Sequence, residues 1–129
     1  MSEQPFRSPI LRRWVLIVYW VVMFVGTHWP EIERYGPERF WRIPHSDKLA
    51  HAGLYAVWTA IWWWLLSAGG RRVAETAVNW LVLGGAVYAI FDEATQAIVA
   101  RDPSIYDFVA DMVGLLMVVS ILSLWQRRR

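Results

Sequence analysis

Four apolar stretches, each close to the length that a membrane-spanning helix needs, constrain the fold of this chain more than any motif in it. They run from Ile10 to Gly26, from His51 to Leu66, from Ala77 to Val99 and from Ile105 to Trp125. A helix must present about 20 predominantly apolar residues to cross the hydrocarbon core of a bilayer. Because 57% of the residues are hydrophobic as well, the sequence predicts an integral membrane protein and excludes an ordinary soluble domain.

The predicted fold class is an all-α membrane protein, a bundle of four transmembrane helices that forms a single domain over residues 1–129. We expect the helices over about residues 10–28, 46–68, 73–100 and 104–126. Arg12 and Arg13 before a short apolar run also fit the start of a signal peptide. The residues that follow this run, Gly26-Thr27-His28-Trp29-Pro30, offer no small-residue cleavage site, so we predict a retained helix.

The basic residues of the connecting segments predict the orientation, because short cytoplasmic loops carry an excess of Lys and Arg. With four helices both termini lie on one side, which also holds the turn with Arg71 and Arg72 and has eight of the 13 basic residues. We therefore expect a multi-pass protein of a bacterial inner membrane with both termini in the cytoplasm. The anchoring residues account for the net charge of +2, so membrane lipids are expected partners and nucleic acid is not.

Polar residues recur at helical spacing at the outer ends of the second, third and fourth predicted helices. The pairs are Asp47 and His51, Glu93 and Gln96, and Asp107 and Asp111. Residues three or four apart lie on one face of a helix, and ionisable side chains inside a membrane are costly enough to suggest a functional site. Counted from N-caps at Ser46 and Ser104, or from the end of the third helix, the deeper member of each pair lies about 8–10 Å inside.

The same helix faces carry small residues, Gly85 and Ala89 on the third helix and Gly114 on the fourth, which let helices approach closely in lipid. We therefore expect the three polar faces to meet in one acidic pocket that opens to the outside. Its predicted binding residues are Asp47, Lys48, His51, Glu93, Gln96, Arg101, Asp107 and Asp111. The candidates for acid–base chemistry are His51, Glu93 and Asp111, and those for a metal ion are the same three with Asp107.

Structural explanations also apply to several of these residues. The helix dipole favours an acid in the first turn of a helix, which accounts for Asp47 and Asp107 without a site. The two basic residues of the pocket can extend to lipid headgroups, and Gln96 is expected to hold a carboxylate by a hydrogen bond. The dipole does not explain Asp111, which is too deep for a cap, or Glu93, which lies near a helix C-terminus.

Several short motifs occur in a fixed order on successive predicted helices. They are Asp47-Lys48-Leu49-Ala50-His51, Glu93-Ala94-Thr95-Gln96, Arg101, Asp107 and Asp111-Met112-Val113-Gly114. Together they resemble the VanZ-like family of small bacterial membrane proteins, over about residues 47–114. Asp111 departs from the pattern, because that family usually has Asn at this position. The resemblance implies a helical membrane fold and a cell-envelope setting, and it implies no particular reaction or drug.

Three functions remain open on the sequence, and no oligomeric state is predicted. The first is binding or processing of an envelope lipid or lipid-linked precursor, in which Lys48 and Arg101 meet an anionic headgroup while His51 and the acids recognise it or transfer protons. The second is a site for a divalent cation, Mn²⁺, Zn²⁺ or Mg²⁺, because the candidate ligands are oxygen-rich with one imidazole. The third is a noncatalytic protein whose polar cluster only holds the helices together. No nucleophile motif, phosphate-binding loop or cofactor fingerprint is present, so the sequence does not decide whether the protein is an enzyme.

Overall fold

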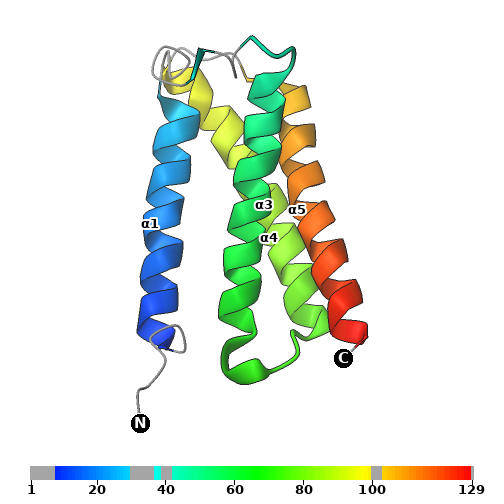
Figure 1. The fold of residues 1–129 in the computed structure, drawn as a ribbon. Coiled ribbons are helices and arrows are strands. Elements are labelled where there is room, and N and C mark those ends of the chain that lie inside the picture. The colour runs from blue at the N-terminus through cyan, green and yellow to red at the C-terminus, as the bar shows by residue number, and fades with distance from the viewer. Residues whose placement is uncertain (1–7, 30–36, 39–41, 100–102, 129) are drawn as a thin grey trace.

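The computed structural model describes residues 8–29, 37–38, 42–99 and 103–128, and these contain helices and connecting segments but no strand (Figure 1). The long helices are α1 (Pro9–His28), α3 (Ser46–Leu66), α4 (Glu75–Gln96) and α5 (Ile105–Arg127). Two 3-10 turns, η3 (Ala68–Gly70) and η4 (Ala97–Val99), follow α3 and α4. The predicted all-α fold with four long helices is confirmed, and each of them is long and apolar enough to cross a membrane.

The starts of the helices differ in detail from the prediction. Ser46 does not cap α3, because it is already the first helical residue and His45 precedes it in the left-handed region (φ 61°). Helix α4 begins at Glu75 since Ala74 before it is extended, with φ −67° and ψ 146°. Ser104 takes the predicted N-cap position of α5, although its hydroxyl makes no capping hydrogen bond.

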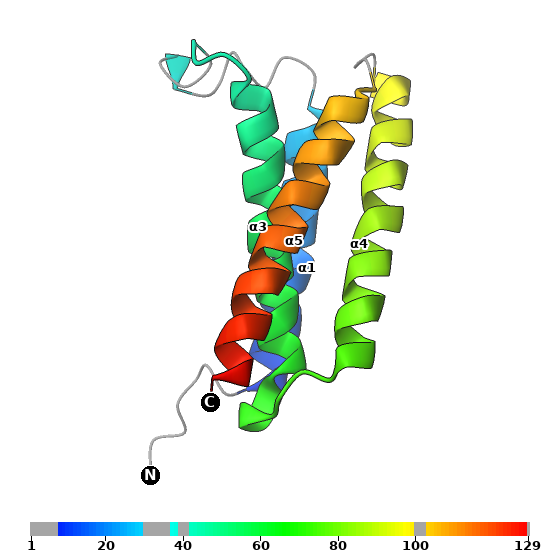
Figure 2. The same ribbon diagram turned by 90° about the vertical axis from the view of Figure 1, so that its right-hand side faces the viewer.

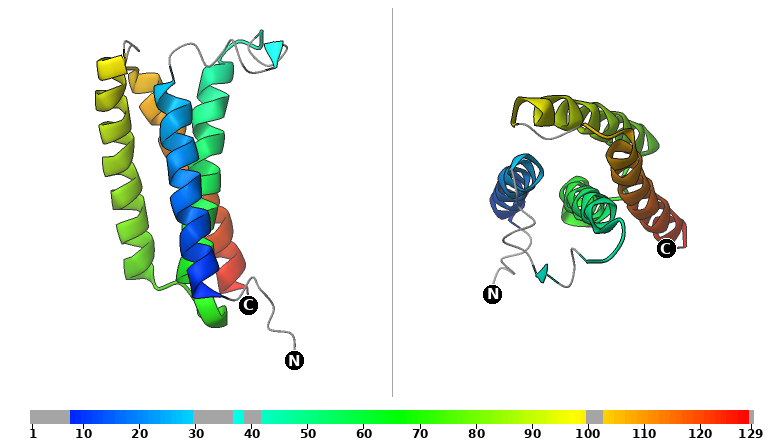
Figure 3. Two further views of the ribbon diagram at one scale, coloured as in Figure 1. Left: turned by 90° about the vertical axis from the view of Figure 1, so that its left-hand side faces the viewer. Right: turned by 90° about the horizontal axis from the view of Figure 1, so that it is seen from above.

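Helix α3 lies between α1 and α5 and packs most extensively on α5 (Figure 3). Helix α4 also packs mainly on α5. The tight connection between α3 and α4 predicts two antiparallel neighbours. These helices do run antiparallel, but their mutual contact is small, and Figure 2 shows α4 standing apart from α3. The outer end of the bundle, opposite the α3–α4 turn, is where α5 comes closest to α4 (Figure 2).

The close packing of α3 and α5 depends on Gly114. A Cβ atom at this position would lie 2.0 Å from the carbonyl oxygen of Ala52, so the two backbones are in direct contact there. On α4, a Cβ atom at Gly85 would lie 2.1 Å from Cδ1 of Leu115 on α5. Gly85, Ala89 and Gly114 are all buried, which confirms the prediction that small residues on these faces lie at helix contacts.

The distribution of side chains is the one expected of helices surrounded by lipid. Large apolar side chains such as Val18, Val87 and Ile121 lie exposed on the outside of the bundle. Ionisable side chains lie inside it instead, the buried ones being Arg12, His28, His51, Asp92, Glu93, Asp107 and Asp111. A soluble protein rarely buries so many charged groups, whereas in a membrane they face the interior of the bundle.

The start of α1 and the end of α5 lie at the same end of the bundle as the α3–α4 turn (Figure 1). Gln126 of α5 fastens this end, because its Oε1 accepts a hydrogen bond from the backbone N–H of Val73 (2.8 Å) and its Nε2 donates one to the carbonyl of Val73 (2.9 Å). Arg71 and Arg72 in the turn are exposed. The residues of the predicted polar pocket lie at the opposite end, which we call the outer end.

Candidate functional site

Three buried ionisable side chains from three helices converge near the outer end of the bundle. His51 comes from the second turn of α3, Glu93 from the last turn of α4 and Asp111 from the second turn of α5. One ligand atom from each lies within 4.8 Å of the others. The exposed fractions are 4%, 8% and 0%, so the predicted meeting of the three faces is observed in the described residues.

Hydrogen bonds to neighbouring elements hold all three of these side chains. Nδ1 of His51 lies 3.0 Å from Oδ1 of Asp111, which links α3 to α5. Oε2 of Glu93 accepts a hydrogen bond of 2.8 Å from the backbone N–H of Ser104, the N-cap residue of α5. The first N–H groups of a helix have no intrahelical acceptor, so Glu93 from α4 satisfies one of them and sits where the dipole of α5 favours an acid.

Each of the two carboxylates has one oxygen that the surrounding protein does not satisfy. Oε1 of Glu93 and Oδ2 of Asp111 are buried, and neither has a hydrogen-bond partner among the described residues. An unsatisfied polar atom in a protein interior is costly, and such atoms are rare in native structures. Two of them beside an imidazole form a set of donors that suits a divalent metal ion of hard or intermediate character.

A second layer of charges lies closer to the outer end. Nζ of Lys48 on α3 donates to Oδ2 of Asp47 (2.6 Å) and to Oδ1 of Asp107 on α5 (3.0 Å). Lys48 therefore neutralises two acids. Asp107 pairs with this lysine and does not join the three residues that share the candidate metal position, although the sequence places it among the ligands. Arg101, the other predicted cation of the pocket, lies outside the described residues.

Gln96 holds a carboxylate by a hydrogen bond, as predicted, and this carboxylate belongs to Asp92, an acid which the sequence analysis missed. Asp92 on α4 is fully buried and accepts hydrogen bonds from Nε2 of Gln96 (3.3 Å) and from Oγ1 of Thr27 on α1 (2.9 Å). Nδ1 of His28 lies 3.6 Å from Oδ1 of Asp92, and Nε2 of His28 lies 2.8 Å from Oγ1 of Thr95. These contacts connect α1 to α4 at the same end of the bundle.

The signal that identifies Asp92 was available in its spacing to Gln96, since residues four apart share a helix face. Thr27 and His28 at the end of the first apolar stretch were the corresponding signal on α1. Glu93 and Asp92 are adjacent and point to different neighbours, so the two buried acids of α4 bind this helix to α5 and to α1 respectively.

The charges of the outer end do not balance among the described residues. The described residues at this end include six acids and two permanent cations, Arg42 and Lys48, and Arg42 pairs with the acid Glu38. The other five acids are Asp47, Asp92, Glu93, Asp107 and Asp111, and two of the three histidines at this end, His28 and His51, contact one of them each. Lys48 lies within salt-bridge distance of only two of these acids. The environment of Glu93 and Asp111 therefore favours a cation over an anion.

Asp111 is the position at which the chain departs from the motif pattern of the VanZ-like family. Its Oδ1 contacts His51, and an Asn side chain offers an oxygen at the same place, so the distinctive feature of Asp111 is its second oxygen, Oδ2, which has no partner among the described residues. No family model, no curated protein and no solved structure matches this chain, so the resemblance to that family stays a prediction based on motifs within the chain.

Proposed function

We propose that this chain is a multi-pass protein of the bacterial inner membrane that binds a divalent cation through His51, Glu93 and Asp111. The cation then engages the phosphate of an envelope lipid or lipid-linked precursor at the outer face. The observation that carries the proposal is the convergence of three buried donors within 4.8 Å of one another, two of which offer carboxylate oxygens without a partner among the described residues.

The cation accounts for the energetics of the cluster. Two carboxylates in a bundle interior repel each other and lose their hydration, which is compensated only by an opposite charge or by hydrogen bonds to every oxygen. His51 contacts one carboxylate oxygen and Ser104 another, which leaves two oxygens for the ion. Mn²⁺ or Zn²⁺ suits a set of two carboxylates and one imidazole, and Mg²⁺ fits it less well because of the nitrogen ligand.

A bound cation also gives the outer end a means to bind an anionic lipid. Lys48 is already paired with Asp47 and Asp107, so a phosphate group approaching these acids needs a further positive charge. A metal ion that keeps open coordination positions supplies it and bridges protein and phosphate. The apolar outer surfaces of the helices fit a protein surrounded by lipid, and the arginines around the α3–α4 turn support a cytoplasmic position for that end.

Elemental analysis of the protein purified in detergent with Mn²⁺ and Zn²⁺ tests the cation. We expect one ion for each chain in the wild type and loss of the ion in His51→Ala and in Glu93→Gln, since each change removes one of the three candidate ligands. Asp47→Asn is the matched control, because Asp47 lies at the same end and pairs with Lys48 but does not belong to the three-residue group. A wild-type protein without a stoichiometric ion after metal-replete purification contradicts the proposal.

The lipid is tested separately, with the protein in nanodiscs and a short-chain polyprenyl phosphate as the probe. Binding of this probe is expected with Mn²⁺ present, and it is expected to disappear on addition of EDTA and in His51→Ala. Binding that is unaffected by EDTA contradicts a role of the ion in headgroup recognition.

A purely structural role is the second candidate, and two contacts favour it. The His51–Asp111 contact joins α3 to α5, and the Glu93–Ser104 hydrogen bond joins α4 to α5. If the cluster only holds the helices together, Glu93→Gln and Asp111→Asn fail to accumulate in the membrane. If it is a cation site, both proteins fold and lose the ion, since an Asn at position 111 keeps the oxygen that contacts His51.

A further inference from the structure

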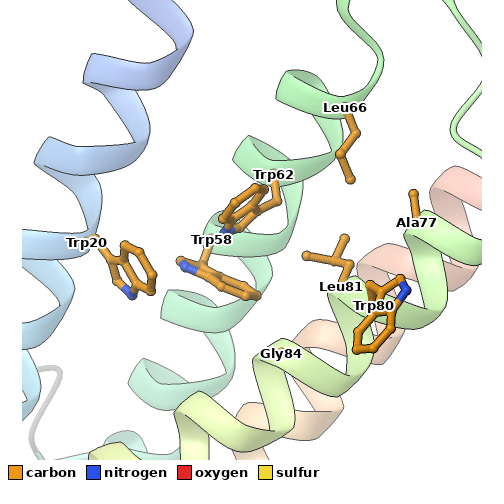
Figure 4. A pocket seen from close by; sticks show the side chains of 8 residues that line it. All are labelled: Trp20, Trp58, Trp62, Leu66, Ala77, Trp80, Leu81 and Gly84. Atoms are coloured by element: carbon orange, nitrogen blue, oxygen red, sulfur yellow. The ribbon is translucent and has the colours of Figure 1, made fainter.

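An apolar cavity of about 440 Å³ lies among α1, α3 and α4 in the half of the bundle that carries the α3–α4 turn (Figure 4). Its walls are mainly tryptophan and leucine side chains, among them Trp20, Trp58, Trp62, Leu66, Trp80 and Leu81. The cavity belongs to the half opposite the His51 cluster and shares no residue with it. It exists because the bulky indoles of α3 face α4, where the two helices make little contact.

Two hydrogen-bond donors in the wall have no acceptor. The indole N–H groups of Trp58 and Trp62 are buried and lack a partner among the described residues. Figure 4 shows both nitrogen atoms on the side of the cavity that faces Trp20. In a bilayer interior no water is available for such groups, so the molecule that fills this space is expected to bring an acceptor oxygen.

The turn at the end of the cavity is positively charged. In the chain, Arg71 and Arg72 follow Leu66 of one wall and precede Ala77 of the other; both are exposed, and they line a neighbouring hollow together with Trp63, Trp125 and Gln126. A lipid in the adjacent leaflet places its phosphate at the level of such residues and its acyl chains below it. The ester carbonyls of such a lipid lie between its phosphate and its acyl chains. Trp62 lies at a corresponding depth, between the level of the arginines and the deeper wall of the cavity.

From these three observations we infer that the cavity binds a diacyl phospholipid with an anionic headgroup. Arg71 and Arg72 contact the phosphate, the N–H groups of Trp58 and Trp62 donate to ester carbonyls, and one acyl chain lies between α3 and α4. A polyprenyl chain is apolar along its whole length and offers no acceptor to the two indoles. The volume lies in the range of about 300–1,000 Å³ that small-molecule sites occupy.

Two glycines offer a matched pair of variants. A Cβ atom at Gly84, which lines the cavity, meets no atom within 4 Å, and the same holds for Gly53 on α3, which is exposed and outside the cavity wall. Gly84→Leu therefore fills the cavity without a backbone clash, and Gly53→Leu adds the same side chain elsewhere. Both change the helix propensity equally, so a difference between them reports on the cavity.

The test measures lipid retained by the protein after detergent washing, by native mass spectrometry, with dioleoyl phosphatidylglycerol as the probe. We expect one molecule for each chain in the wild type and in Gly53→Leu, and a large loss in Gly84→Leu. A dialkyl phosphatidylglycerol, which lacks ester carbonyls, is expected to bind about 30-fold more weakly, as is typical of two lost hydrogen bonds. Trp62→Phe is expected to reduce this preference for the ester, and Arg71→Gln with Arg72→Gln to reduce the preference over phosphatidylcholine.

Equal retention by Gly84→Leu and the wild type overturns the inference, and so does equal retention of the ester and ether lipids. The chain has no cysteine, so Ala77→Cys in the cavity wall provides a further test. Efficient crosslinking between copies through this residue in vesicles assigns the cavity to a second copy of the chain and also overturns the inference. None of these results depends on the cation at the outer end, so the inference stands or fails independently of the proposed function.

Discussion

Gly114 is the residue at which a single added carbon atom should do most damage to the fold. The Cβ of Gly114→Ala would lie 2.0 Å from the carbonyl oxygen of Ala52 and 2.8 Å from its carbonyl carbon, where ordinary contact begins at 3.4 Å. Because the obstructing atoms are backbone, α3 and α5 must separate locally by about 1.4 Å. Overpacking of this kind typically costs about 1–3 kcal/mol of stability.

The stability cost of Gly114→Ala can be compared with that of the same substitution at two glycines on α4. At Gly85 the obstructing atom is Cδ1 of Leu115, the end of a flexible side chain, so Gly85→Ala is expected to cost less than Gly114→Ala. At Gly84 nothing lies within 4 Å, so Gly84→Ala is expected to be neutral or to stabilise the helix by up to about 1 kcal/mol. The predicted order of stability is therefore Gly84→Ala, Gly85→Ala, Gly114→Ala, from highest to lowest.

The assay is the free energy of unfolding in mixed micelles, followed by circular dichroism during titration with SDS. Gly114→Ala should also affect the contact between Asp111 and His51, because Asp111 lies one turn away on α5. The distance from its Oδ1 to Nδ1 of His51 is 3.0 Å. A local separation of 1.4 Å stretches this contact beyond hydrogen-bond distance, so binding of the divalent cation should weaken as well. A Gly114→Ala protein as stable as Gly84→Ala refutes the reasoning that α3 and α5 are in backbone contact.

Three other predictions follow from contacts outside the cation cluster. Asp92→Leu should destabilise the attachment of α1 by about 1–3 kcal/mol, measured by the same SDS titration, because it removes the acceptor of Thr27 and Gln96; Asp92→Asn keeps an acceptor and should be milder. Gln126→Leu should lower the free energy of unfolding by a similar amount, about 1–3 kcal/mol, because the backbone N–H and C=O of Val73 both lose their partner. A stability equal to that of the wild type contradicts a stabilising role of these two hydrogen bonds. A C-terminal tag should be protected from protease in intact spheroplasts, and cleavage of the tag there reverses the proposed orientation.

Three of the four candidate metal ligands, His51, Glu93 and Asp111, converge as the sequence predicts, because two independent constraints act on them. Burial of a charge is costly, which makes Glu93 and Asp111 informative, and helical periodicity places each on the same face as a small residue. The small residues at positions 85 and 114 then show which faces pack together. Depth along the helices completes the assignment, since all three ligand positions lie at comparable distances from the outer end.

Asp92 could not be assigned by the same reasoning, although it is as deeply buried as Asp111. Neighbouring residues on a helix point about 100° apart, so the direction of Glu93 says nothing about the partner of Asp92. The partner is Thr27 on α1, and the segment from Trp14 to Gly26 has no charged residue, so periodicity does not show which of its faces meets the bundle. The capping prediction at Ser46 failed because Ser46 is already the first residue of α3, after His45 in the left-handed region.

The position of α4 connects the two halves of the molecule. At the outer end, Asp92 binds α4 to α1 and Glu93 binds it to the start of α5. At the opposite, inner end, Gln126 of α5 binds Val73 in the segment that leads into α4. Between these attachments it has little contact with α3, and the tryptophans of α3 face it across the cavity. The position of α4 thus depends on polar contacts at either end and on its packing against α5 at Gly85, and not on packing against α3. A cation bound at the proposed site beside Glu93 would strengthen the outer attachment alone and would leave the inner half free to accommodate the proposed lipid chain.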